Sequence, residues 1–271
     1  MRLVAPDSTT TVPLDTTGIL NCTASYNGHP MHLWIDTGVS YALFMQEEKA
    51  RKYGLKLFAH DSTLVNGILS PKAEAVIDTL RIGTFCLTDI PVIVLCHDIT
   101  HGMPDSIRGK DVRHIVDSIY SMSDAVLGLP ALCKLGQVTF DLSGHKLTLR
   151  APRHPFTPSE EPNLYLNQNM LYTRCTLNGA EAVGLLDTGN TGNYLTFSHL
   201  FYETNKDRIP LDTLTAKRKI GSWIYGHTLA DMPYEIPLQP DIRFDGLPVR
   251  IPPKADIIIT PTATRAGAVA A

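Results

Sequence analysis

Residues 33–38 read LWIDTG, and residues 185–189 read LLDTG. Each copy ends a longer segment with the same plan, namely a β-rich run, an Asn-Gly turn and a second apolar run. The two segments are ILNCTASYNGHPMHLWIDTG (residues 19–38) and LYTRCTLNGAEAVGLLDTG (residues 171–189). Asn27-Gly28 and Asn178-Gly179 stand at the same distance before the Asp, which predicts a type I′ hairpin feeding a buried strand in each half. The sequence therefore repeats a structural element as well as a tripeptide.

The acidic residues of the two copies, Asp36 and Asp187, suggest a chemistry. Burial at the end of an apolar strand raises the pKa of an Asp, and the Gly that follows lets the backbone turn tightly. Two such carboxyl groups facing each other would share one proton, because like charges a few ångströms apart cannot both be ionised. The ionised group could activate a water while the protonated one polarises a peptide carbonyl. A single Asp-Thr-Gly also fits an ordinary β-turn, but the matched surroundings favour a catalytic pair.

The rest of the chain is predicted to be overwhelmingly β. Residues 150–162 carry four prolines and no apolar periodicity, which predicts an extended linker and the division 1–151, 152–162 and 163–271. Helices are expected over residues 46–55, 107–120 and 130–136, and a hairpin is expected about Ser143-Gly144. Val76–Leu95 and Pro237–Ile259 form a second matched pair, in which Ile90-Pro91-Val92 is set against Leu247-Pro248-Val249.

Composition excludes several classes of protein. The chain has 271 residues, 44% hydrophobic and 19% charged, which is ordinary globular usage. A net charge of -3 gives no indication of a nucleic-acid partner. No apolar run approaches the roughly 18 residues needed to span a bilayer, and the start has no apolar signal core. These features predict a cytoplasmic protein, or a periplasmic or secreted one if an export segment precedes the sequence.

The two motifs resemble those of retropepsin-like aspartic proteases, particularly bacterial proteins with tandem copies of that domain. The resemblance rests on residues 34–40 (WIDTGVS), residues 185–191 (LLDTGNT) and residues 126–129 (VLGL), which fit the apolar-apolar-Gly element under the family's active site. It implies an all-β fold with two tandem retropepsin-like (acid protease) β-barrel lobes that form a pseudo-dimer. Ile257-Ile258-Ile259 is followed by no such Gly, so the second lobe is expected to be shortened, without its terminal helix and hairpin.

The resemblance also implies an activity, an aspartic endopeptidase with Asp36 and Asp187 as the catalytic pair. The residues expected to support this pair are Thr37, Gly38, Ser40, Thr188, Gly189, Thr191, Leu127 and Gly128. The residues expected in flaps over the substrate are Asn66, Gly67, Trp223, Tyr225 and Gly226, although Trp223 and Tyr225 fit ordinary sheet packing equally well. No metal or other cofactor is expected, because Cys96, His97, His101 and His114 lack the spacing of a compact zinc site.

Three alternatives stay open at this level. The two halves can pair within one chain, or each half can pair with its equivalent in a homodimer. We favour pairing within one chain, which predicts a monomer that acts on a polypeptide substrate. A protein that kept the fold but lost activity would be a non-catalytic peptide-binding pseudoprotease. A purely structural β-protein explains neither the two motifs nor their matched surroundings.

Overall fold

The structure is a computed structural model, which describes residues 1–65, 68–96, 121–152, 164–190, 194–209, 219–223, 226–235, 241–244, 247–249 and 256–260. The chain divides into two compact units. The first comprises residues 1–158, 168–170 and 187–191, and the second comprises residues 159–167, 171–186 and 192–271. The second Asp-Thr-Gly thus groups with the first unit. Most of the predicted linker lies outside the described residues, so the predicted domain boundaries stay a prediction.

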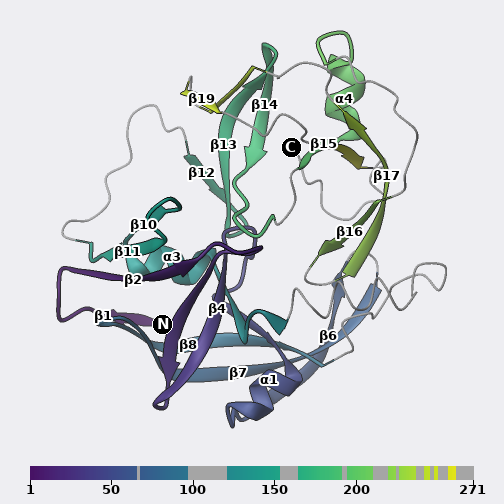
Figure 1. Cartoon of the computed structure of the whole chain (residues 1–271). Coiled ribbons are helices and arrows are strands. Elements are labelled where there is room, and N and C mark those ends of the chain that lie inside the picture. The colour runs from purple at the N-terminus through teal and green to yellow at the C-terminus, as the bar shows by residue number, and fades with distance from the viewer. Residues whose placement is uncertain are drawn as a thin grey trace. The chain divides into compact units, whose positions relative to one another are not determined.

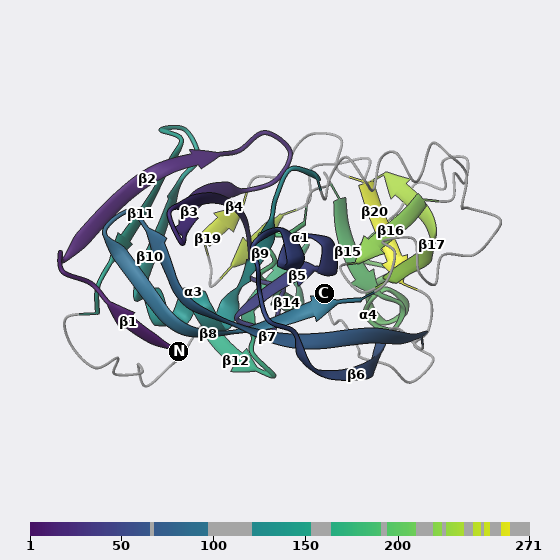
Figure 2. The same ribbon diagram turned by 90° about the horizontal axis from the view of Figure 1, so that it is seen from below.

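The first unit is built around a closed barrel of six strands. Following the hydrogen bonds from β3 leads through β4, β9, β5, β8 and β7 and back to β3. The N-terminal strand β1 pairs with β8, and the β10–β11 hairpin lies beside β2 (Figures 1 and 2). The strands are β1 (Arg2–Val4), β2 (Thr9–Asp15), β3 (Asn21–Tyr26), β4 (His29–Asp36), β5 (Leu43–Gln46), β6 (Phe58–Val65), β7 (Ile68–Ile82), β8 (Phe85–Leu95), β9 (Ala125–Gly128), β10 (Gln137–Asp141) and β11 (Lys146–Arg150).

Alternation of apolar and polar residues explains these strands. Exposed and buried residues alternate along the whole of β2, as expected for a strand with one face on a core. The last four residues of β4 are all buried, because both faces and both edges of this strand are covered at its end. The core includes the fully buried side chains of Met31, Leu33 and Ile35. The run that leads into the first Asp-Thr-Gly is therefore a core strand, as predicted.

Among the described residues of the first unit, two short helices flank the barrel strands. Helix α1 (Glu47–Lys52) has acidic residues in its first turn and basic ones in its last, which complements the helix dipole. It ends earlier than predicted, because Gly54 has φ +69° and turns the chain away. Helix α3 (Leu129–Leu135) and the following β10–β11 hairpin confirm the predicted helix and terminal hairpin. The helix predicted over residues 107–120 lies outside the described residues.

The described residues of the second unit form two sheets. One has the order β12-β13-β18-β19 with β14 paired to β13, and the other has the order β15-β20-β17-β16. Helix α4 follows β15, and Ser198 caps it by accepting from the Phe201 amide at 3.1 Å. The elements are β12 (Leu164–Asn167), β13 (Met170–Leu177), β14 (Ala180–Leu185), β15 (Tyr194–Ser198), α4 (His199–Asn205), β16 (Lys219–Trp223), β17 (Gly226–Glu235), β18 (Ile242–Phe244), β19 (Leu247–Val249) and β20 (Asp256–Thr260).

Strand register corrects one correspondence that was drawn from the sequence. Phe85 pairs with Ile82 across the β7–β8 hairpin, and Leu247 pairs with Phe244 across the β18–β19 hairpin. Leu247 therefore corresponds to Phe85, and its match with Ile90 is wrong, because a shared apolar-Pro-Val triplet does not determine strand register. Strand β20 pairs in parallel with β15, as the end of β8 does with β5. Residues 257–259 thus lie in a position like the end of β8. The apolar-apolar-Gly element lies instead at the end of β9 in the first unit, so no Gly is expected after residue 259.

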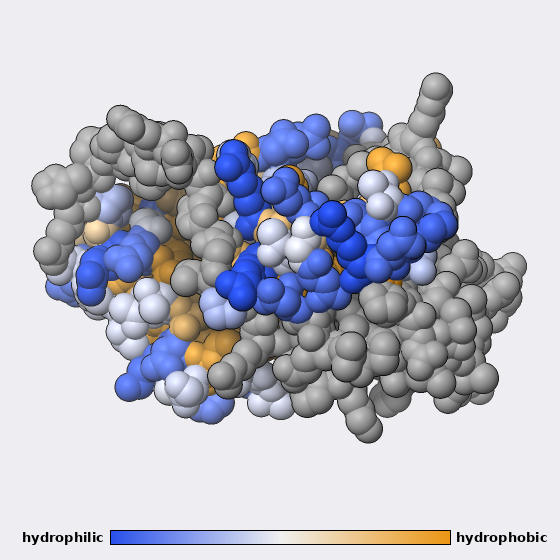
Figure 3. All heavy atoms as spheres, turned by 90° about the horizontal axis from the view of Figure 1, so that it is seen from above, coloured by the Kyte–Doolittle hydropathy of each residue, from blue (hydrophilic) through white to orange (hydrophobic). Residues whose placement is uncertain are grey.

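On the face drawn in Figure 3, hydrophilic side chains surround smaller groups of apolar ones. Among the described residues, no helix has the length and apolar composition needed to cross a membrane.

Candidate active site

Asp36 stands at the end of the core strand β4 and is 5% exposed. Strand β9 runs parallel beside β4 and sets Gly128 opposite Asp36. On its other edge β4 pairs with β3. The carboxyl group is therefore held where neighbouring strands exclude most of the water.

Asp187 follows β14 and is partly buried. The two Asp-Thr-Gly turns are built alike. Gly38 donates its amide to Asp36 Oδ1 at 2.7 Å, and Gly189 donates its amide to Asp187 Oδ1 at 2.8 Å. In each turn the residue after the Gly donates to the Asp carbonyl at 3.4 Å. The repeated tripeptide thus produces the same local turn twice.

Reciprocal hydrogen bonds join the two turns through their threonines. The Thr37 amide donates to Thr188 Oγ1 at 3.0 Å, and the Thr188 amide donates to Thr37 Oγ1 at 3.0 Å. The Thr188 hydroxyl also donates to the Ile35 carbonyl at 2.9 Å. Each turn therefore supplies a donor and an acceptor to the other, as in a contact between equivalent parts.

Each carboxyl group lies against the glycine of the opposite turn. A Cβ atom added at Gly38 would lie 2.7 Å from Asp187 Oδ1, and one added at Gly189 would lie 2.1 Å from Asp36 Oδ2. Real Cβ atoms do not approach other atoms so closely, so a larger residue at either place would displace the facing carboxyl group. The predicted role of both glycines in shaping the turns agrees with this geometry.

The environment of Asp36 favours its neutral form. Burial, followed by the charge and the hydrogen bonding of Asp187, raises the pKa of Asp36 to about 8. Hydrogen bonds from the Gly38 and Gly189 amides act in the opposite direction and are weaker. A carboxyl group that keeps its proton at neutral pH can donate a hydrogen bond to a substrate, which an ordinary Asp cannot do.

The floor beneath the first turn is formed by the end of β9. The Gly128 amide donates to the Ala42 carbonyl at 3.1 Å, and the Leu129 amide donates to the Val39 carbonyl at 3.0 Å. A Cβ atom at Gly128 would lie 2.0 Å from the Tyr41 carbonyl oxygen. This close approach explains why the apolar-apolar-Gly element ends in glycine.

The structure brings together most of the predicted site residues. They are Asp36, Thr37, Gly38, Thr188, Gly189, Leu127 and Gly128, with Leu127 fully buried between β4 and β5. Trp223 and Gly226 face each other at the end of the β16–β17 hairpin, as a flap would require, and their role stays a prediction. Asn66, Gly67, Thr191, Tyr225, His97, His101 and His114 lie outside the described residues.

One contact of the site was not predicted. The Asn169 side-chain amide donates to the Ser40 carbonyl at 3.3 Å, just beyond the first Asp-Thr-Gly. Gln168 and Asn169 both have positive φ, 49° and 59°, and form the turn between β12 and β13. Asn is a common residue in such turns, so the sequence could have predicted the turn but not its contact.

The barrel and the paired turns define an all-β fold that holds two turns of the same sequence against each other. Residues 22–131, about two fifths of the chain, match the family model described as aspartyl protease. The match runs from β3 to α3 and includes Asp36 and Gly128.

Comparison with other proteins gives two further results. None of the curated proteins matches the chain. Among solved structures, a retropepsin-like aspartic protease from Rickettsia conorii matches with 18% sequence identity and a TM-score of 0.36, and the match covers 55% of this chain and 91% of that chain.

Proposed function

We propose that this chain is an aspartic endopeptidase whose catalytic pair is Asp36 and Asp187. The observation that carries the proposal is the reciprocal bonding between Thr37 and Thr188, which holds the two turns against each other. The match of residues 22–131 to the aspartyl protease family model supports a protease of this class. Burial of Asp36 beside a second carboxyl group is the arrangement that acid–base catalysis requires.

The proposed reaction uses one proton shared by the pair. Asp36 holds this proton at the start, because its burial favours the neutral form, and donates a hydrogen bond to the scissile carbonyl oxygen. The Asp187 carboxylate takes a proton from a water molecule, whose oxygen attacks the carbonyl carbon. The Asp36 proton passes to the carbonyl oxygen, which gives a diol and leaves the water-derived proton on Asp187. The diol collapses when the Asp187 proton passes to the amide nitrogen, the C–N bond breaks and one diol hydroxyl gives its proton to Asp36. The pair then again holds a single proton.

The second unit is proposed to be a shortened lobe of the same kind. Its pairings β13–β14, β15–β20 and β17–β20 follow the order of β3–β4, β5–β8 and β7–β8 in the first unit. With one Asp from each repeated segment, a single chain would supply the whole pair, and the protein would act as a monomer.

The test is hydrolysis of an unfolded polypeptide by the full chain, followed by mass spectrometry. We expect cleavage at acidic to neutral pH and inhibition by a statine-type transition-state analogue. Asp36→Asn and Asp187→Asn should each lower kcat by about 10²–10⁴-fold, because each removes an acid–base group. Specific activity should not change on dilution, whereas that of a homodimer would fall.

Asp89→Asn is the matched control. Asp89 is an exposed carboxylate of β8 that pairs with Arg2, so this variant should cleave like the wild type. An Asp36→Asn protein that cleaves at the wild-type rate would contradict the proposal. Peptide binding without turnover, unchanged in both Asn variants, would instead favour a binding protein.

A further inference from the structure

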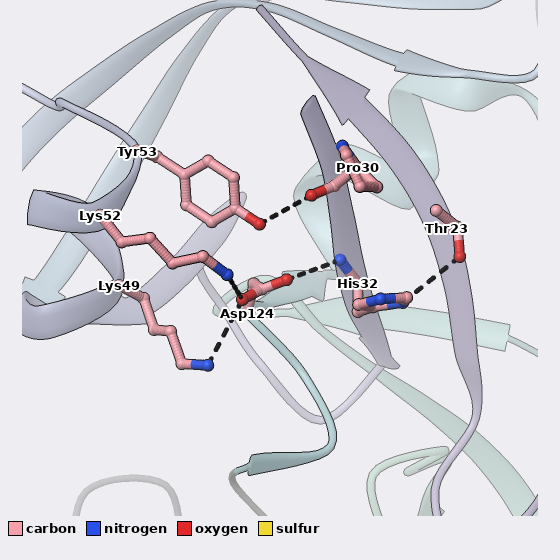
Figure 4. A network of polar contacts seen from close by, with 7 residues as sticks. All are labelled: Thr23, Pro30, His32, Lys49, Lys52, Tyr53 and Asp124. Atoms are coloured by element: carbon pink, nitrogen blue, oxygen red, sulfur yellow. Dashed lines mark hydrogen bonds and ion pairs between the residues drawn. The ribbon is translucent and has the colours of Figure 1, made fainter. Parts of the chain in front are cut away.

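Asp124 is a buried charge that the proposed reaction does not use. It lies one residue before β9, and its side chain is 5% exposed. Figure 4 shows its carboxylate between the backbone of β4 on one side and two lysines of α1 on the other. Burying a charge is costly unless it is paired and hydrogen-bonded, so an ionised group at this place calls for an explanation.

The two carboxylate oxygens have different partners. Oδ2 accepts from the His32 amide of β4 at 3.0 Å. Oδ1 accepts from Lys52 Nζ at 2.9 Å and from Lys49 Nζ at 3.3 Å, both on α1. One side chain thus links the strand that carries Asp36, the helix that follows β5 and the start of β9.

The backbone of Asp124 completes a two-point attachment to β4. Its amide donates to the His32 carbonyl at 2.8 Å, while its carboxylate accepts from the His32 amide. This attachment precedes the parallel pairing that runs from Leu33 beside Ala125 to Asp36 beside Gly128. The attachment therefore fixes the start of the β4–β9 pairing, and the last pair of this pairing is Asp36 beside Gly128.

The far end of β9 contacts the loop that follows Asp36. The Gly128 and Leu129 amides bond the Ala42 and Val39 carbonyls, and Gly128 has no room for a Cβ. Strand β9 is only four residues long, roughly 13 Å at about 3.3 Å per residue. A displacement of β9 at Asp124 should therefore also displace Gly128 at the other end of the strand.

Asp124 is not a second acid or base. Although burial acts to raise it, the His32 amide and the lysine contacts bring the pKa of Asp124 down to about 2. The group is therefore ionised at every pH at which the proposed reaction would run.

We propose that Asp124 is a positioning residue for Asp36, which acts by fixing β9 against β4 and α1 so that Gly128 holds the loop after Asp36 in place. This inference rests on the proposed function for its effect on cleavage, but the transmission along β9 can be measured without activity.

The experiment compares Asp124→Asn with the wild type and with Asp89→Asn in the full chain. Asn keeps the shape and one acceptor but gives up the charge that pairs with Lys49 and Lys52. Active sites are counted by titration with the statine-type inhibitor, so that unfolded molecules do not enter kcat. We expect kcat per titrated site to fall roughly 10- to 100-fold with KM within about twofold, because displacement of a catalytic group costs rate more than binding. The basic limit of the pH profile should move to lower pH as Asp36 becomes more solvated.

The second measurement is amide hydrogen exchange, which reads the transmission directly. In Asp124→Asn the Gly128 and Leu129 amides should exchange at least about tenfold faster, while amides of the β10–β11 hairpin stay unchanged. If this variant does not fold, the double variant Lys49→Gln, Lys52→Gln takes its place, because it keeps the attachment to β4.

The outcomes separate the two proposals. Faster exchange at Gly128 in Asp124→Asn, together with a wild type that cleaves nothing, would support the transmission along β9 and overturn the protease proposal. A variant with a lower melting temperature but wild-type kcat per site, pH profile and exchange would overturn the positioning role and leave Asp124 as a stabilising residue only. Asp89→Asn should change none of these quantities.

Discussion

Strands β4 and β14 both lead into an Asp-Thr-Gly turn, but they differ in what lies beside them. Strand β4 is flanked by β3 and β9, and the residue at its end, Asp36, is 5% exposed. Strand β14 pairs with β13 alone in the part of the chain that the structure describes, and Asp187 is only partly buried. The turns themselves have the same hydrogen bonds. Local sequence thus determines the turn, whereas neighbouring strands determine how dry its carboxyl group is.

The largest expected difference between the two regions is in the effect of a glycine substitution on stability. Gly128→Ala would place a Cβ 2.0 Å from the Tyr41 carbonyl, whereas Gly184→Ala in β14 would place one 3.2 Å from Cys175 Sγ. Backbone cannot yield as a side chain can, so Gly128→Ala should lower the free energy of unfolding by about 3 kcal/mol or more. Gly184→Ala should stay within about 1 kcal/mol of the wild type. Urea unfolding of both variants measures the difference, and equal effects would show that β9 does not carry the floor.

The second test compares the proton held by Asp36 with an Asn that cannot titrate. The pKa of Asp36 is about 8 in the folded protein, well above the ordinary pKa of an Asp, so folding retains a proton that the unfolded chain releases. Stability from this group is present below pH 4 and is lost as pH rises toward 8, by at most about 1.4 kcal/mol per pH unit.

Asp36→Asn should remove this loss, and its stability advantage over the wild type should grow from pH 4 to pH 8. Asp187→Asn should keep part of the loss, because burial is the largest cause of the shift and remains. Chemical unfolding at several pH values measures both, with Asp89→Asn following the wild type. A wild type and an Asp36→Asn protein with parallel pH dependence would show that Asp36 is not desolvated.

The predictable part of the fold and site is the part encoded locally. Asn27-Gly28, the apolar run of β4 and the Asp-Thr-Gly turns each depend on neighbours in sequence, and the structure confirms their predicted conformation. The glycine of the β9 element was predicted from its resemblance to the family.

The contacts that could not be predicted join residues far apart in the chain. Asp124 meets His32 and Lys52 only because β9 returns to β4, and Asn169 meets Ser40 across a still longer separation in sequence. No local pattern distinguishes Asp124 from an exposed Asp before a strand. The same limit explains the misplaced match of Leu247, since register depends on partner strands and not on a shared triplet.

The smallest expected effect lies where the two regions should be equal. Gly28 and Gly179 have φ +79° and +76°, with no atom within 4 Å of an added Cβ. The preceding residues, Asn27 and Asn178, both have φ 49°, so each hairpin turns with positive φ at two residues. Gly28→Ala and Gly179→Ala should therefore each cost about 1 kcal/mol of stability, from backbone strain alone. Urea unfolding should give the two values within about 0.5 kcal/mol of each other. Neither turn depends on the neighbouring strands that make Asp36 more buried than Asp187. A much larger loss of stability in Gly28→Ala would mean that the strands beside β4 also stabilise the turn at Gly28. The two turns would then not be equivalent.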